Sequence, residues 1–361
     1  MRVTLGDVCE KGSSNLKQSD VINKTGAYPI YGAAGYLGNV DFYHQDKPYV
    51  AVVKDGAGIG RTTLHPAKSS VIGTMQYLLP KSNVLPEYLY YVVQYMHLEK
   101  YFTGATIPHI YFKDYKAEQF NLDAMERQKE IVASLQKVET FIKVRQQQLQ
   151  KLDELVKARF VEMFGDCKSR VSMNELCSII TDGTHQPPRF QESGIPFIFV
   201  SNLVGNVVTY NAEKFISEDT YAELYKRTPI EIGDLLLSTV GSYGHPAVVT
   251  DDRKFLFQRH IAYLKPRHNM VNSFYLHSAL LAPDGQRQIE EKVKGIAQKT
   301  LNLSEIKKIV VPLPTIEEQN QFEKFVNQTD KSKLQVPSGN ALCIRYPIFY
   351  RNNIFERSIK C

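Results

Sequence analysis

The sequence has no tryptophan, few cysteines and no long apolar segment. Its five cysteines (Cys9, Cys167, Cys177, Cys343 and Cys361) show no Cys-x-x-Cys spacing, and an odd number cannot all pair with one another. This usage is typical of a reducing compartment and argues against a zinc site. A run of roughly 18 apolar residues and a basic-then-apolar leader are both absent, so we expect a cytoplasmic protein that does not span a membrane.

The composition is that of a globular chain with room for two cores. The 361 residues exceed one typical domain, and 43% of them are hydrophobic while 23% are charged. The net charge of +6 permits an acidic partner such as nucleic acid. Many ordinary proteins are equally basic, so the charge alone does not define a function.

A long repeat is the most informative feature of the sequence. Glu126 and Gln128 recur 191 positions later as Glu317 and Gln319, each pair near the start of an expected helix that follows an apolar strand. Further upstream, two other pairs of segments correspond, namely Arg2–Cys9 with Arg170–Cys177 and Tyr77–Pro80 with Tyr263–Pro266. Solenoid repeats have periods of roughly 20 to 50 residues, so this period indicates a duplicated domain.

Residues 125–164 contain no glycine or proline, and they predict a single helix of roughly 60 Å. A four-then-three spacing forms one apolar seam, interrupted only by Arg145 and Arg159. Such a seam needs a helical partner, and the repeat supplies one at 315–335. The second helix is expected to be half as long, because Lys333 takes the place of Ile142 and Pro337 follows. The expected helix-pairing residues are Ile131, Leu135, Val138, Ile142, Leu149, Leu152, Val156, Phe322 and Val326.

The loops of the two β-rich regions carry polar, basic and aromatic side chains of the kinds that hydrogen-bond base edges and phosphates. Any exposed loop contains such residues, so each one taken singly is weak support for DNA binding. In the first region the candidates are Lys54, Arg61, Thr62, Thr63, His109 and Lys113. In the second they are His185, Gln186, Arg189, Ser242, Tyr243, His245, Gln258, Arg259 and His260.

Three segments partly match motifs of enzymes, but none of them has all the features that its motif requires. Gly56–Gly60 follows a strand but precedes poor helix sequence, which favours a tight β connection over a phosphate-binding loop. Gln186–Arg189 lacks the first residue and the aromatic of a methyltransferase Asp/Asn-Pro-Pro-aromatic segment. Asp284, Glu290 and Lys292 fall on one expected helix, whereas a nuclease needs them to converge on a metal ion. We therefore predict no catalytic residue, no metal site and no cofactor.

The order of these parts resembles the DNA specificity subunit of type I restriction-modification systems, over residues 1 to about 335. The segments that carry the likeness are Leu313–Gln319 with a looser copy at Leu122–Gln128, Gly233–Leu236, Gly241–Gly244 and Gln258–Ile261. The resemblance implies an α+β fold with two β-rich target recognition domains, each followed by a spacer helix, the helices pairing as an antiparallel coiled coil. The expected divisions are 1–122, 123–165, 166–314, 315–335 and a divergent tail at 336–361.

The resemblance also implies a function without catalysis in this chain. Each recognition domain would read one half of a bipartite site in double-stranded DNA. Two modification subunits carrying S-adenosylmethionine would methylate adenine, and restriction subunits would cleave. Two alternatives stay open: a duplicated coiled-coil adaptor for protein partners, and a truncated, inactive specificity subunit, because the second helix is short.

Overall fold

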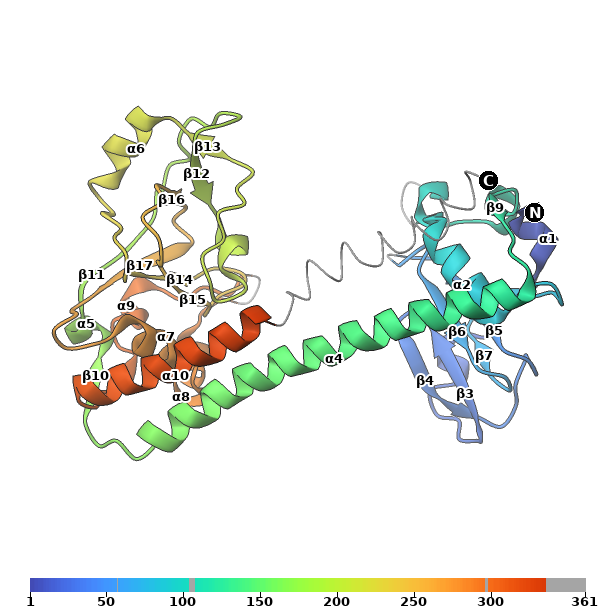
Figure 1. Cartoon of the computed structure of the whole chain (residues 1–361), viewed down its shortest axis with the longest axis horizontal. Coiled ribbons are helices and arrows are strands. Elements are labelled where there is room, and N and C mark those ends of the chain that lie inside the picture. Colours follow the sequence, from blue (N-terminus) through green and yellow to red (C-terminus); the bar gives the residue numbers. More distant parts are fainter. Residues whose placement is uncertain (57, 104–107, 296–297, 336–361) are drawn as a thin grey trace. The chain divides into compact units, whose positions relative to one another are not determined.

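The computed structural model describes residues 1–56, 58–103, 108–295 and 298–335 (Figure 1). Among these residues the chain forms two compact units, the first ending at Arg145 and the second beginning at Gln146. This division falls inside one long helix, so each unit contains a β-rich region and part of that helix. The tail expected at 336–361 lies outside the described residues.

The first unit is built on a four-stranded antiparallel sheet with the order β2-β8-β5-β6. These strands are β2 (Cys9–Ser13), β5 (Tyr49–Val53), β6 (Thr62–His65) and β8 (Met75–Pro80). All five residues of β5 are fully buried, because the strand is central and both of its faces are covered. A three-stranded sheet contains β3 (Tyr28–Gly32), β4 (Gly35–Val40) and β7 (Ser70–Val71), and a separate pair joins β1 (Arg2–Thr4) to β9 (Gln119–Asn121).

The helices of the first unit are short, apart from the long spacer helix. They are α1 (Leu5–Val8), η1 (Gln18–Asp20), α2 (Pro86–Tyr95), η2 (Leu98–Tyr101) and α3 (Phe112–Tyr115). The sequence predicts that α2 continues to about Tyr101, but it ends at Tyr95. The cause is His97, whose left-handed backbone (φ 50°) breaks the helix before a 3-10 turn begins.

The second unit repeats the same construction. Its four-stranded sheet has the order β11-β17-β14-β15, with β11 (Cys177–Asp182), β14 (Leu235–Ser238), β15 (Pro246–Val248) and β17 (Ile261–Pro266). A three-stranded sheet contains β12 (Ile195–Ile198), β13 (Phe215–Ile216) and β16 (Leu256–Phe257), and β10 (Arg170–Ser172) pairs with β18 (Val310–Pro312). Its helices are α5 (Met173–Leu176), η3 (Val200–Leu203), α6 (Glu218–Tyr225), α7 (Ser273–Leu281), α8 (Pro283–Lys292), α9 (Leu303–Ile306) and α10 (Ile316–Gln335).

The predicted duplication is confirmed in detail. Each unit opens with a capping box, in which Asp7 accepts hydrogen bonds from Thr4 and Glu175 accepts them from Ser172. In each unit the strand after the first short helix lies at one edge of the four-stranded sheet. The correspondence extends through the middle of the units, where the two sequences do not look alike.

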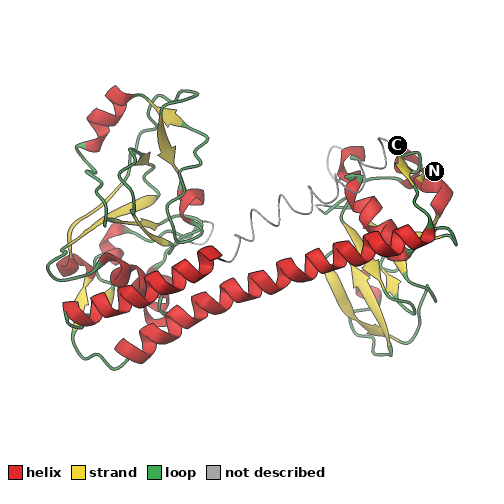
Figure 2. Cartoon of the chain, in the orientation of Figure 1, coloured by secondary structure: helices red, strands yellow, loops and turns green. Residues whose placement is uncertain are grey.

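The long helix α4 spans Met125–Phe164, the bounds that the sequence predicts (Figure 2). Every position of the predicted seam is buried or half-buried. Ile131 and Leu135 belong to the core of the first unit, where they pack with residues of the β-rich region. Val138, Ile142, Leu149 and Leu152 are half-buried, and Val156 packs against the core of the second unit.

Within the second unit, the end of α4 lies against α10. The rings of Phe160 and Phe164 are 5.5 and 5.6 Å from the ring of Phe322, and Lys333 forms a 2.8 Å ion pair with Asp153. Residue numbers rise along one helix as they fall along the other, so the two segments are antiparallel. Both expected α10 residues, Phe322 and Val326, are buried in this contact.

Candidate nucleic-acid interface

In the first unit, the connection between β5 and β6 presents Lys54 and Arg61. The Gly60 amide donates to the Val53 carbonyl, and the Val53 amide donates to the Arg61 carbonyl, both at 2.9 Å. Gly60 has a φ of +80°, which this narrow turn requires. The connection leads into strand β6 and opens no helix, so the predicted tight β connection is confirmed.

An antiparallel bridge between Thr103 and His109 lies against this connection. Thr103 and His109 exchange backbone hydrogen bonds of 2.9 and 3.0 Å. The Gly56 amide then donates to the Pro108 carbonyl, and the Ile110 amide donates to the Lys54 carbonyl, both at 3.0 Å. These bonds bring Lys54 and His109 together, although 55 positions separate them in the sequence.

The side chains beside this bridge form a mixed polar and aromatic cluster. His109 pairs with Asp55, and its ring lies 4.0 Å from the ring of Tyr111. The Lys113 ammonium lies 5.3 Å from the centre of the Tyr111 ring. Tyr111 is exposed, so the cluster offers a flat aromatic surface beside a cation.

Thr62 and Thr63 do not join this cluster. Thr62 is buried, and its hydroxyl donates to the Gly60 carbonyl at 3.1 Å. The Thr63 hydroxyl lies 2.8 Å from Nε2 of His65, whose ring stacks on Tyr49 on the opposite face of β6. Adjacent residues of a strand point to opposite faces, and here both side chains already have partners. The candidates that the first unit brings together here are therefore Lys54, Arg61, His109 and Lys113.

In the second unit, four loops meet at the corresponding place. The Thr239 amide donates to the His260 carbonyl at 2.9 Å, and the Arg259 amide donates to the Thr184 carbonyl at 3.1 Å. The Leu301 amide donates to the Thr239 carbonyl at 2.8 Å. An open depression between these loops is lined by Asp182, Thr239, Val240, Arg259, His260, Gln298, Thr300, Leu301, Asn302 and Leu303.

Charged groups border this depression. Asp182 forms 2.8 Å ion pairs with both His185 and Arg227. Arg259 is exposed and its Nε lies 3.4 Å from Nε2 of His260. Burial, and then the charge of Arg259, lower the pKa of His260, so its ring is neutral near pH 7 and suits hydrogen bonding more than charge pairing.

Tyr243 lies in a second polar group at the same edge. Its hydroxyl donates to Glu290 and accepts a 3.3 Å hydrogen bond from Lys299, which also pairs with Glu290 at 3.0 Å. The hydrogen bond to Glu290, and then the one to Tyr243, raise the pKa of Lys299, so its ammonium group stays charged. His245 instead faces Asn206, with 3.1 Å between Nδ1 and Oδ1. Gln186, Arg189 and Ser242 are exposed, and Gln258 is half-buried.

The antiparallel bridge of the first unit has a counterpart that sequence reasoning missed. Lys294 and Thr300 exchange backbone hydrogen bonds of 2.9 and 2.8 Å, and the Gly241 amide donates to the Lys299 carbonyl at 3.1 Å. These bonds match those of Thr103, His109 and Gly56. The signal was available, because a shift of 191 positions carries Pro108 and His109 onto Lys299 and Thr300. Arg227 was also missed, and no pattern in the sequence connects it to Asp182.

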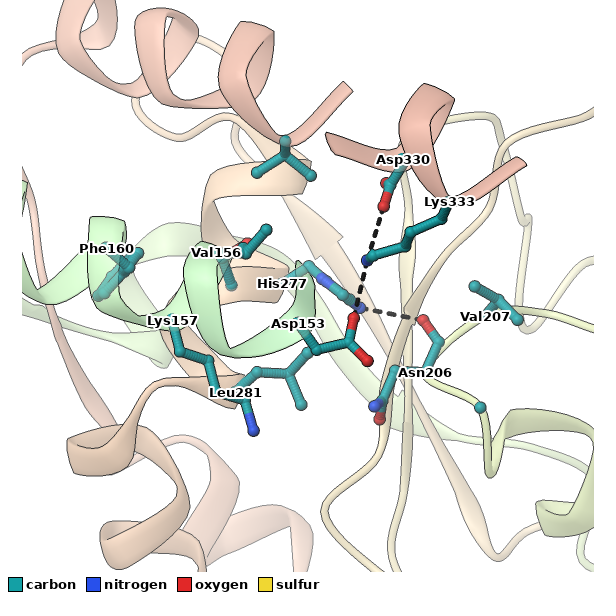
Figure 3. Close-up of a pocket in the computed structure, with 13 residues that line it drawn as sticks. Asp153, Val156, Lys157, Phe160, Asn206, Val207, His277, Leu281, Asp330 and Lys333 are labelled. Carbon is teal, nitrogen blue, oxygen red and sulfur yellow. Dashed lines mark hydrogen bonds and ion pairs between the residues drawn. The ribbon is translucent and has the colours of Figure 1, made fainter. Parts of the chain in front are cut away.

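A separate cavity lies where α4, α7 and α10 meet in the second unit (Figure 3). Lys333 bridges Asp153 and Asp330 at 2.8 Å each, and Nε2 of His277 lies 3.0 Å from the Asn206 carbonyl oxygen. Burial alone would lower the pKa of Lys333, but its bonds to the two carboxylates raise it above the ordinary value. The ion pair of Lys333 with Asp153 joins α10 to α4, and the His277 contact joins α7 to the loop that contains Asn206.

The described parts of the chain contain no group of three or more histidine, cysteine, aspartate or glutamate side chains that could hold a metal ion. Within the same residues, no helix combines the length and the apolar character that a membrane span requires. Asp284 and Glu290 lie on α8 as expected; Asp284 pairs with Arg170 and Arg287, and Glu290 with Lys299.

The described residues form two similarly built units, each with a β-rich region joined to a helix. Residues 1–154 and 171–337 match the family described as the type I restriction modification DNA specificity domain. The chain belongs to this family.

Relatives and solved structures agree with this assignment. The EcoBI specificity subunit of Escherichia coli is 32% identical over 146 residues, which cover 40% of this chain and 31% of that subunit. The chain therefore spans less than a third of this relative. The MjaVIII specificity subunit of Methanocaldococcus jannaschii is 20% identical over 307 residues, which cover 78% of this chain and 72% of that subunit. Both of these relatives are named specificity subunits.

Two solved structures share the fold. The S subunit of a type I restriction-modification system from M. genitalium has a TM-score of 0.60 at 15% identity, covering 98% of this chain and 96% of that one. A second structure, from work on the assembly of a type I restriction-modification system, has a TM-score of 0.54 at 15% identity. The match covers 99% of this chain and 97% of that one. At this identity the likeness shows the fold alone.

Proposed function

We propose that this chain is the DNA-reading subunit of a type I restriction-modification complex, and that it recognises a bipartite site through its two units. The observation that carries the proposal is the duplicated antiparallel bridge and β connection, whose backbone hydrogen bonds are the same in both units while the side chains differ. A constant backbone with variable side chains is what two readers of different half-sites need.

The side chains of the two units differ in chemistry at corresponding positions. His109, Tyr111 and Lys113 of the first unit correspond to Thr300, Asn302 and Ser304 of the second. Imidazole, amide, hydroxyl and ammonium groups present different donors and acceptors to base edges in the major groove. The remaining sequence-derived candidates complete the proposed surfaces, with Arg259 and Lys299 as the exposed cations for phosphate or guanine.

The helices serve as the spacer in this proposal. The antiparallel contact between the end of α4 and α10 supports a coiled coil, and the half-buried seam residues Val138, Ile142, Leu149 and Leu152 would extend it. Two modification subunits would dock on the helices and methylate adenine, and restriction subunits would cleave. The two recognition units on one spacer would multiply their affinities through effective concentration.

The test is to express the chain with the methyltransferase subunit of its own system and to map adenine methylation across the host genome. We expect one modified bipartite motif, and electrophoretic mobility shifts with that motif that weaken steeply as salt rises. No methylated motif, together with no salt-sensitive binding, would contradict the proposal and favour an adaptor for proteins.

A further inference from the structure

Two buried glutamines hold the spacer helices to the recognition units. Gln128 lies in the first turn of α4 and Gln319 in the first turn of α10, and both side chains are 0% exposed. A polar side chain with no access to water must find its partners inside the protein. The partners of these two glutamines are the same in both units.

The first glutamine joins α4 to the start of α2. Its Oε1 accepts a 2.9 Å hydrogen bond from the backbone amide of Leu85, the N-cap of α2. Its Nε2 donates to the Asn83 carbonyl at 3.0 Å and to the Asp123 carbonyl at 2.9 Å. One side chain therefore connects the strand end, the spacer helix and the loop before α2.

The second glutamine repeats this arrangement. Oε1 of Gln319 accepts a 2.8 Å hydrogen bond from the backbone amide of Asn272, the N-cap of α7. Its Nε2 donates to the Met270 carbonyl at 3.2 Å and to the Pro314 carbonyl at 3.0 Å. In both units the acceptors lie two residues before the N-cap and five residues before the glutamine itself.

Only a carboxamide satisfies this site. It must accept one hydrogen bond and donate two in a fixed plane, which a glutamine side chain does. A glutamate would face two carbonyl oxygens with no proton to donate, and a leucine would leave a buried amide without an acceptor. Tyr275 supports the same joint, because its hydroxyl donates to the Pro312 carbonyl at 2.7 Å, as Tyr88 donates to Asn121 at 3.2 Å.

We propose that Gln128 and Gln319 are positioning residues that fix the angle at which each spacer helix leaves its recognition unit. This inference rests on the proposed function and adds that these joints select the number of base pairs between the two half-sites. The 20 described residues of α10 span roughly 30 Å, so a tilt of about 10° at the base of the helix moves Gln335 by roughly 5 Å. That displacement exceeds the rise of one base pair, about 3.4 Å.

The experiment uses the full chain with its methyltransferase subunit and a plasmid library in which the half-sites are fixed and the intervening length varies by single base pairs. The variants are Gln128→Leu and Gln319→Leu, with Gln136→Leu and Gln321→Leu as controls, since these two glutamines are exposed on the same helices. We expect the wild type and the controls to prefer one length. In each joint variant, the ratio of methylation at the preferred length to methylation at other lengths should fall about tenfold. This is the size of effect for one unsatisfied buried hydrogen bond.

A purely structural role would lower methylation equally at every length, and that result would overturn the inference. An unchanged length preference in correctly folded Gln→Leu variants would overturn it as well. If these variants do not fold, Tyr275→Phe removes a single hydrogen bond from the second joint and is judged by the same two outcomes. A wild-type complex that methylates no bipartite site would instead contradict the proposed function, so the two failures are distinguishable.

Discussion

Individual side chains separate the proposed DNA surface from the scaffold. Arg259 is exposed beside a neutral His260, whereas Thr62 is buried in the strand next to the same kind of loop. Sequence reasoning grouped Thr62 with the DNA-binding residues, because residue type and loop position do not reveal which face of a strand a side chain occupies. The same limit hid Lys299, because the backbone hydrogen bond that places it joins segments far apart in the sequence.

Arg259→Ala should weaken binding to the cognate site by about 1 to 3 kcal/mol if the guanidinium contacts a base. The loss should be confined to one position of the half-site read by the second unit. Binding measured against single-base variants of the site tests this. Lys168→Ala, which removes an exposed cation outside these loops, is the control, and a uniform loss across all variants would assign Arg259 to phosphate contact instead.

Asp234 should make the stability of the second unit depend on pH. Burial raises the pKa of this carboxyl, although Tyr263 donates a 2.8 Å hydrogen bond to it. The folded state therefore binds the proton more tightly than the unfolded state, so this contribution to stability is greatest below the unfolded pKa and is lost as pH rises through the folded pKa. In the Asp234→Asn variant, thermal stability should depend less on pH across that interval. An unchanged dependence on pH would contradict the argument.

Cys9 and Cys177 should resist thiol reagents in the native protein. Burial raises the pKa of each thiol to about 12, so almost no thiolate forms at pH 8. Cys167 is half-buried and should be alkylated first among these three. Mass spectrometry after brief alkylation, with a urea-unfolded sample as the control, measures the order, and early labelling of either buried cysteine would show that its unit opens.

At the scale of elements, the prediction was accurate where local sequence dominates. The limits of α4 follow from 40 residues without glycine or proline. The structure describes α10 as far as Gln335, the last described residue, so the expected length of the second helix stays a prediction. The three sheets of each unit could not be placed from the sequence, because their order depends on pairings between distant strands, such as β2 with β8. The start of α2 was predicted, but its early end at His97 has no local sequence signal.

The contact between α4 and α10 should depend on aromatic packing. Phe322→Ala should destabilise the second unit by about 3 to 5 kcal/mol, because it leaves a cavity among Phe160, Phe164 and Tyr275. Val161→Ala, on the exposed side of α4, should change stability little. Urea unfolding of both variants measures the difference, and equal midpoints would show that the helices are held by other contacts.

For the whole molecule, the proposed function predicts a strong difference between complete and half sites. DNA that keeps only one half-site should bind about 100-fold to 10,000-fold more weakly, because the second unit then loses its effective concentration. Titrations with matched duplexes of equal length and charge measure the ratio. Equal affinity for both duplexes would mean that a single unit does all the binding.

The repeated joint between each unit and its helix has a consequence for how such proteins can change. The contacts of Gln128 and Gln319 are made mainly with backbone atoms, which are the same whatever side chains the loops carry. A recognition unit from another chain with the same joint could therefore be exchanged for either half without redesigning the connection. New target sequences would then arise by recombination of whole halves, with no intermediate that has lost its fold.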